Sequence, residues 1–112
     1  MKQQTILRQG DVLLVRVDAL PKGARDITED GRIVLAEGEM TGHAHAVHEP
    51  LTKATPNGKA RLWNAGDERY IQVLETTALR HEEHAAIPLE PGVYRVGLQR
   101  EYSPDEIRSV AD

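Results

Sequence analysis

Short apolar runs separated by turn-forming residues recur along this chain. Residues 12–17 (Val-Leu-Leu-Val-Arg-Val) are rich in β-branched side chains and too few for a helix, so they predict a buried strand. Residues 32–36 follow an Asp-Gly pair, which predicts a tight turn leading into a second strand. Residues 43–48 predict a third strand, closed by Glu49-Pro50 because the residue before proline resists helix.

The second half of the chain continues this pattern. Residues 56–59 (Pro-Asn-Gly-Lys) predict a turn at the tip of a hairpin or in an exposed loop. Residues 69–75 alternate apolar with polar side chains, as a half-buried strand does. Residues 93–102 predict an antiparallel strand with one solvent-facing side. Its apolar face would carry Tyr94, Val96, Leu98 and Tyr102.

The end of the chain carries the one clear helix signal. Ser103 suits an N-cap, Pro104 the first helical position and Glu106 the third position after the cap, so a short C-terminal helical turn is predicted. No repeat or linker divides the 112 residues, so residues 1–112 are expected to form a single domain. Several short strands at near-regular spacing predict a mainly β fold, a small antiparallel β-barrel or sandwich.

Composition narrows the functional classes. The formal charge is −4 and the 14 Lys and Arg residues are scattered, so binding to nucleic acid is not expected. No apolar stretch approaches the roughly 20 residues that span a bilayer, and residues 1–5 lack the apolar core of a signal peptide, so we expect no membrane association and a cytoplasmic location. The absence of Phe limits the core, which favours a homo-oligomer.

The five histidines gather in two short windows, residues 43–48 and 81–84. Because the chain has no cysteine, any metal site must use imidazole and carboxylate ligands. On a strand His43 and His45 project to the same face, whereas His48 points oppositely or lies past the strand end. Two such imidazoles can chelate one ion.

The second window supplies the rest of a coordination shell. His81 and His84 are three apart, which brings both rings to one side of a bend or short helical turn, and Glu82 and Glu83 between them can supply oxygen ligands or accept hydrogen bonds from the ligands. We therefore predict one divalent metal ion, Zn, Fe, Mn or Ni, whose ligands would be His43, His45, His81 and His84, with His48 as a further candidate. Glu83 or Glu49 would be a further ligand or the catalytic base.

Three functions fit such a site. With an open coordination position the metal would make the protein a hydrolase or oxygenase acting on a small molecule. If four histidines saturate the ion, the domain would be a non-catalytic, oligomeric binding module with a structural metal. A metal-independent nuclease or phosphodiesterase using a histidine pair as acid and base is the third reading.

Residues 38–49, Gly-Glu-Met-Thr-Gly-His-Ala-His-Ala-Val-His-Glu, resemble the first motif of the cupin family, in which a glycine is followed by His-x-His and then by Glu. The resemblance covers about a dozen residues. It implies a cupin-like metal-binding β-barrel, with metal ligands at His43, His45 and Glu49. A further histidine would come from His81 or His84.

Overall fold

The computed structural model describes residues 5–37 and 43–98, which form β-strands and no helix. The strands are β1 (Ile6–Gln9), β2 (Val12–Val17), β3 (Arg25–Asp26), β4 (Ile33–Glu37), β5 (Ala44–Val47), β6 (Ala60–Ala65), β7 (Glu68–Val73), β8 (Thr77–Leu79), β9 (Ile87–Leu89) and β10 (Gly92–Leu98). The predicted mainly β class is confirmed. The helical turn predicted at Ser103 lies outside the described residues.

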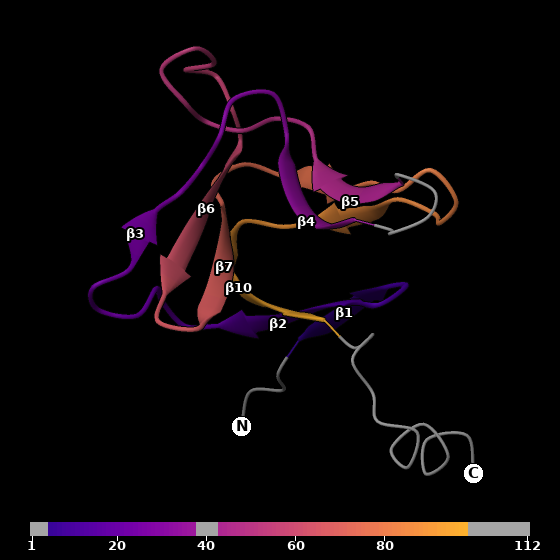
Figure 1. Cartoon of the computed structure of the whole chain (residues 1–112), viewed down its shortest axis with the longest axis horizontal. Helices are drawn as coiled ribbons and strands as arrows, with labels where there is room; N and C mark the ends of the chain where they lie inside the picture. The colour runs from indigo at the N-terminus through magenta and orange to yellow at the C-terminus, as the bar shows by residue number, and fades with distance from the viewer. Residues whose placement is uncertain (1–4, 38–42, 99–112) are drawn as a thin grey trace, which may run out of the picture.

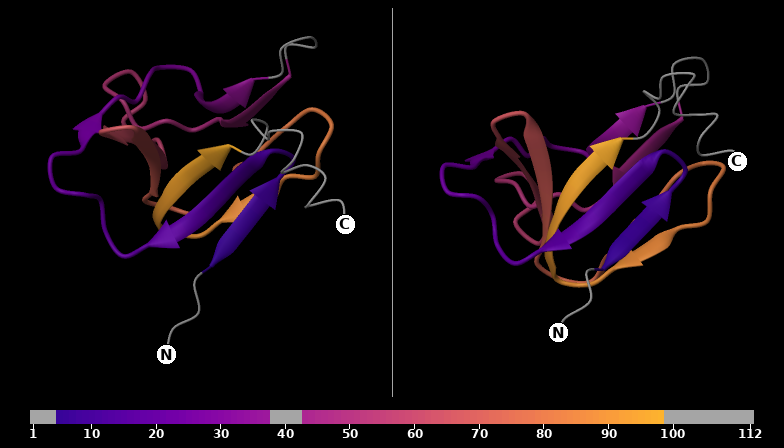
Figure 2. Two further views of the ribbon diagram at one scale, coloured as in Figure 1. Left: turned by 60° about the horizontal axis from the view of Figure 1, so that its bottom comes forward. Right: turned by 90° about the horizontal axis from the view of Figure 1, so that it is seen from below.

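The strands form one large sheet and two small ones. The six-stranded sheet has the order β1-β2-β10-β7-β6-β3, and every pairing in it is antiparallel. The hairpins β4-β5 and β8-β9 make the two small sheets. An isolated bridge between Ala46 and Arg80 joins β5 to the end of β8. In Figures 1 and 2 these two hairpins lie across from β1 and β2.

The hydrophobic core lies between these layers. β2, β7 and β10 contribute Leu14, Ile71 and Tyr94 from one side, and the two small sheets contribute residues such as Leu35 and Leu79 from the other. Tyr94 is 1% exposed, and its hydroxyl donates to the Glu90 carbonyl at 2.8 Å, so its polar end is satisfied. The predicted inward face of the last strand is confirmed at Tyr94 and Val96, but Leu98 at the strand end is 37% exposed, and Tyr102 lies outside the described residues.

A closed barrel, cupin-like or otherwise, is not formed by the described residues. β1 and β3 are the two edges of the large sheet, and neither pairs with another sheet. Where β1 approaches the β8–β9 segment, the connection is made by the Gln9 side chain, which donates to the carbonyls of Leu79 and Ala85. Side-chain hydrogen bonds thus replace the backbone ladder that a closed barrel requires.

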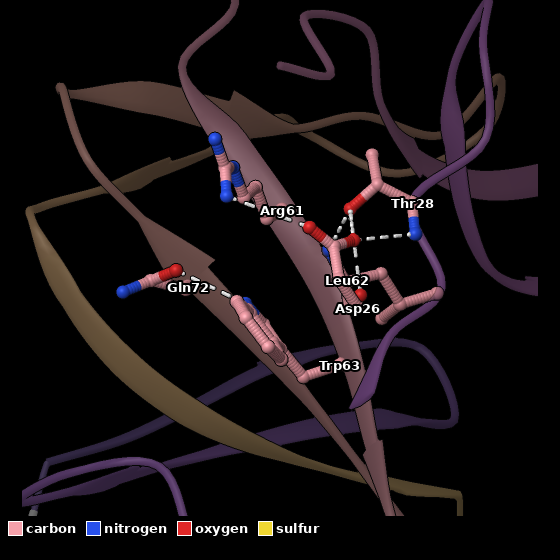
Figure 3. A network of polar contacts seen from close by, with 6 residues as sticks. All are labelled: Asp26, Thr28, Arg61, Leu62, Trp63 and Gln72. Carbon is pink, nitrogen blue, oxygen red and sulfur yellow. Dashed lines mark hydrogen bonds and ion pairs between the residues drawn. The ribbon is translucent and has the colours of Figure 1, made fainter. Parts of the chain in front are cut away.

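The short edge strand β3 is held by side chains as well as by its pairing with β6. Asp26 accepts hydrogen bonds from the backbone and hydroxyl of Thr28, and Thr28 Oγ1 accepts from Leu62 N at 2.8 Å. Figure 3 shows this network beside Arg61, whose guanidinium lies 3.5 Å from Asp26 Oδ2. Trp63 on the neighbouring strand donates to Gln72 at 3.0 Å and is half-buried. These contacts keep β3 in register at the edge.

Candidate metal centre

Three segments far apart in the sequence meet at the candidate centre. The first is the turn between β1 and β2, which has Gly10 and Asp11 as its two central residues. Gly10 has φ 57°, and the first central position of a two-residue hairpin turn commonly requires such a left-handed residue. The second is β5, which carries His45, and the third is the segment 81–84 that follows β8.

The bridge between β5 and Arg80 brings the two histidine windows together. Ala46 N donates to Arg80 O at 2.9 Å, and Arg80 N donates to Ala46 O at 2.8 Å. Because each partner is the chain neighbour of a histidine, His45 and His81 lie side by side. Their ring centroids are 4.2 Å apart. This backbone pairing, which the sequence did not reveal, is what assembles the centre.

His45, His81 and His84 form the first potential ligand group. One ring nitrogen of each lies within 4.8 Å of the corresponding nitrogen of the other two. Ligand nitrogens around a tetrahedral zinc ion with bonds of about 2.0–2.1 Å are roughly 3.3 Å apart, so small side-chain rotations would complete the geometry. His45 is buried, His81 is half-buried and His84 is exposed. The group therefore has a fixed inner end and an accessible outer end.

Gln9 sets the orientation of His45. Its amide nitrogen donates to Leu79 O and Ala85 O, each at 2.9 Å, which leaves the amide oxygen facing His45 Nδ1 at 2.8 Å. An amide oxygen can only accept, so His45 Nδ1 must carry the proton and the lone pair lies on Nε2. A histidine held in this way is the usual form of a metal ligand. Gln9 is only 3% exposed, so water competes little for these bonds.

The backbone of Gly10 packs directly against two of the imidazoles, those of His45 and His84. A Cβ atom at this position would lie 2.9 Å from His84 Nε2 and 3.3 Å from His45 Nε2. Both Nε2 atoms therefore converge on the same small residue from different segments. A side chain here would occupy the space in which the two nitrogens meet.

The protonation of His45 favours the ligand form. Burial, followed by the neighbouring His81 and His84, lowers the pKa of His45 below its ordinary value, and Asp11 and Glu82 oppose that change only in part. The neutral imidazole is the form that coordinates metals. The protein thus keeps an unprotonated nitrogen donor at the inner end of the centre.

His81 is constrained differently. Glu83 N donates to His81 Nδ1 at 2.9 Å, so in the neutral ring the proton lies on Nε2. An ion that takes His81 as a ligand must displace either this hydrogen bond or that proton. We therefore expect His81 to contribute less to metal affinity than His45 or His84.

A second group adjoins the first and shares His81 with it. One ligand atom from each of His43, His81 and Glu82 lies within 4.8 Å of the others. Glu82 Oε1 accepts from Ala44 N at 3.0 Å, and this hydrogen bond is the main reason that the pKa of Glu82 is lowered. His43 Nδ1 lies 3.5 Å from Glu83 Oε2. The four histidines predicted as one set are thus divided between two overlapping groups.

The remaining predicted residues belong to neither ligand group, although Glu83 lies beside the second one. Among the described residues, neither group includes His48, Glu49 or Glu83. His48 is exposed beyond the end of β5, and Glu49 accepts from the Thr77 hydroxyl at 2.7 Å and lies 3.3 Å from Lys59 Nζ. The Thr77 hydrogen bond is the main cause of the lowered pKa of Glu49.

Sequence reasoning missed Gln9 and Gly10 as parts of the centre, whereas Glu82 was among the carboxylates expected between His81 and His84. The Gly10-Asp11 pair was recognisable as a turn, but nothing in the sequence linked it to the histidines, which are 32 or more positions away. Nothing in the local sequence indicated a functional role for Gln9, because a single glutamine beside a turn is common. Only the packing of β1 against the β8–β9 segment gives it a role.

A family model described as "Domain of unknown function (DUF8820)" matches residues 8–99. The chain belongs to this family. The matched stretch of this DUF8820 domain includes Gln9, Gly10 and the histidines of both groups, so the whole candidate centre lies inside it. Comparisons with curated proteins and with solved structures gave no match. Within residues 5–37 and 43–98, no helix is long and apolar enough to cross a membrane.

Proposed function

We propose that this DUF8820 protein binds one divalent transition-metal ion through His45, His81 and His84 and uses it to act on a small molecule. The observation that carries the proposal is the convergence of three imidazole nitrogens within 4.8 Å, one of them held by Gln9 in the tautomer that leaves Nε2 free. Three imidazoles suit Zn, Fe or Ni better than the oxygen-preferring Mg and Ca.

A catalytic role is favoured over a structural one by the number and exposure of the ligands. Structural zinc sites are closed by four protein ligands, whereas catalytic sites have three and leave a position for water or substrate. Here the first group supplies three, and His84 is exposed. A bound ion would act as a Lewis acid towards a substrate oxygen or, as Fe(II), take part in oxygen chemistry.

Glu83 is the carboxylate that we propose for proton transfer beside the ion. Glu82 accepts a backbone hydrogen bond from Ala44, which lowers its pKa and makes it a weaker base. Glu83 is exposed and lies 3.5 Å from His43, so the two side chains can exchange a proton with each other and with solvent. Glu49 receives no role, because Thr77 and Lys59 already occupy its oxygens.

The first experiment is metal analysis by mass spectrometry on tag-free protein incubated with Zn, Fe, Mn or Ni. We expect about one ion per chain for the wild type and almost none for the His45→Ala, His84→Ala double variant. His48→Ala is the matched control, since it removes a histidine of the same window that lies outside both groups. Wild-type protein that retains no metal, or equal loss in the control, would refute the proposal.

X-ray absorption spectroscopy on the loaded protein separates the catalytic from the structural reading. Three imidazoles with one or two water-like ligands favour catalysis, and activity screening should then begin with hydrolysis and oxygen consumption. Four imidazoles would mean that His43 joins the shell and that the ion is structural.

A further inference from the structure

One hollow lies next to the candidate centre, and a second hollow shares the wall residue His48 with it. The first has a volume of about 260 Å³ and is lined by Ala44, His48, Arg80, His81, Glu82 and Ala86. The second, of about 390 Å³, is lined by Gly31, Pro50 and residues 54–58 together with His48 and Glu49. His81 belongs both to the first hollow and to the metal-binding group. A molecule bound in the first hollow would therefore contact His81, which both potential ligand groups share, and Glu82 of the second group.

Arg80 places a positive charge in the wall of the first hollow. Arg80 is paired with Ala46 in an antiparallel bridge. Directly paired residues share one face of a sheet, and so do residues two positions apart on a strand. Arg80 and His48 therefore project to the face of Ala46, which is opposite to that of His45. Both backbone hydrogen bonds of the bridge fix the base of the Arg80 side chain. Among residues 5–37 and 43–98, Arg80 forms no ion pair.

The two carboxylates beside these hollows are already hydrogen-bonded. Glu82 accepts from Ala44 N, and Glu49 accepts from Thr77 and lies 3.3 Å from Lys59 Nζ. The lowered pKa of Glu49 is due first to the Thr77 hydrogen bond and also to the charges of Lys59 and Arg80, so Arg80 lies near Glu49 but forms no ion pair with it among the described residues. The planar fork of Arg80 can therefore still bind a carboxylate in two parallel hydrogen bonds. The nearby negative charge of Glu82 and Glu49 disfavours a dianion such as a phosphate monoester, so a monoanion fits better.

The second hollow has a preformed and largely apolar wall. Backbone hydrogen bonds hold its loop in place, from Leu51 N to Ala60 O at 2.8 Å and from Lys59 N to Glu49 O at 2.7 Å. A Cβ at Gly58 would overlap the Pro50 carbonyl, so the loop packs tightly on itself. Ala54 and Pro56, which are exposed, offer apolar surface to the uncharged part of a ligand, and the fully buried Pro50 supports the loop behind them.

We infer that the two hollows bind an elongated monocarboxylate, with its carboxylate on Arg80 and its apolar chain passing over His48 towards the loop. As a statement about the substrate, this rests on the proposed function, because only a bound ion at His81 would make the ligand a substrate. As a statement about binding, it stands on Arg80 and the hollows alone.

The test uses hexanoate and its uncharged analogue hexanamide as probes, with dissociation constants measured by ligand-observed NMR on the full chain. We expect hexanoate to bind at least about tenfold more tightly than hexanamide, as a charge-assisted hydrogen-bond pair implies. Arg80→Gln should remove that preference. Arg25→Gln is the matched control, because it removes the same charge from the edge strand β3, which lies on the opposite side of the view in Figure 1 from β5.

Equal binding of the two probes, binding of neither, or a preference that survives Arg80→Gln would each overturn the inference. Metal content measured on the same preparations keeps the two proposals apart. Protein that binds hexanoate through Arg80 but takes up no metal would refute the proposed function alone. Protein that takes up metal but shows no Arg80-dependent preference would refute only the carboxylate site.

Discussion

At the scale of single residues, the amide of Gln9 links three parts of the chain. Its nitrogen reaches the carbonyls of Leu79 and Ala85, and its oxygen reaches His45 Nδ1. All three hydrogen bonds of this buried amide are thus made to the candidate centre and to the segment beside it. Its role is to position His45 rather than to touch a metal.

Gln9→Leu should therefore weaken metal binding without removing a ligand. Loss of the partner of a metal-binding histidine typically reduces affinity by about 10–100-fold, and the unsatisfied carbonyls should lower the free energy of unfolding by about 1–3 kcal/mol. Competition titration with a chelator and urea unfolding measure the two effects. Gln9→Glu keeps an acceptor for His45 but loses the donors, so it should lose stability while largely retaining metal affinity. Unchanged affinity in Gln9→Leu would contradict the positioning role.

Gly10→Ala offers a second residue-scale prediction with a close control. Gly10 and Gly66 each begin a two-residue Gly-Asp turn and have φ of 57° and 62°. An alanine at either position should cost about 1–2 kcal/mol of stability because it must adopt a left-handed conformation. Only at Gly10 would the new Cβ meet His84 and His45, since nothing lies within 4 Å at Gly66. Metal affinity should therefore fall in Gly10→Ala and stay unchanged in Gly66→Ala. An equal effect of the two variants on metal affinity would contradict the proposed contact of Gly10 with His45 and His84.

At the scale of elements, strand β5 separates two kinds of surface. Its burial is complete from Ala44 to Val47, yet the side chains alternate between the core side, with His45, and the side of Arg80. The end of β5 is tied to the start of β8 by the hydrogen bond from Thr77 to Glu49. The hairpins β4-β5 and β8-β9 are thereby connected at both ends of their contact.

Thr77→Val should weaken this connection at neutral pH and have little effect in acid. The depressed pKa of Glu49 means that its hydrogen bond stabilises the fold at neutral pH, and this contribution is lost as the pH falls through the folded-state pKa. In the variant that pKa should rise towards its ordinary value, which an NMR titration of the Glu49 carboxyl carbon would show. Thr76→Val is the matched control, because Thr76 Oγ1 donates to Glu90 instead. If the pKa of Glu49 rises equally in the control, Thr77 is not its cause.

At the scale of the whole molecule, the candidate centre joins the two layers. Gln9 and Gly10 belong to the large sheet, whereas His45 and the segment 81–84 belong to the layer of small hairpins (Figure 2). The described part of the fold is open at this edge, where the Gln9 side chain forms hydrogen bonds to the segment around β8 and β9 and the Gly10 turn packs against His84. A bound ion would hold the layer of hairpins together at the same place.

Metal binding should therefore raise the unfolding temperature of the whole domain. At a free concentration 100 times the dissociation constant, the ion stabilises by about 2.7 kcal/mol, which for a domain near 100 residues raises Tm by roughly 10–20 °C. Differential scanning calorimetry with and without Zn or Ni measures the change. The His45→Ala variant should show almost none of it, and His48→Ala should retain it. An equal rise in His45→Ala would locate the bound metal elsewhere.

Much of the local structure followed from the sequence alone. β2 covers the predicted residues, and β4, β5, β7 and β10 lie within one to a few positions of theirs, because alternation and β-branched runs report directly on strands. The gathering of histidines in two windows indicated a metal site, and the strand parity of His45 and His48 anticipated that they face apart. The strands β1, β3, β8 and β9 were not predicted, since they are short and carry weak patterns.

The tertiary structure decided how these pieces combine. The pairing of Ala46 with Arg80, the packing of the Gly10 turn under His84, and the reach of Gln9 to Leu79 all join residues that are 34 or more positions apart. Local sequence patterns carry no information on such contacts, because they arise from the closing of one layer on another. The sequence therefore determined which residue types could bind a metal. Only the fold determined that His45, His81 and His84 share one group, that His43 falls in the next, and that Gln9 holds the lone pair of His45 in place.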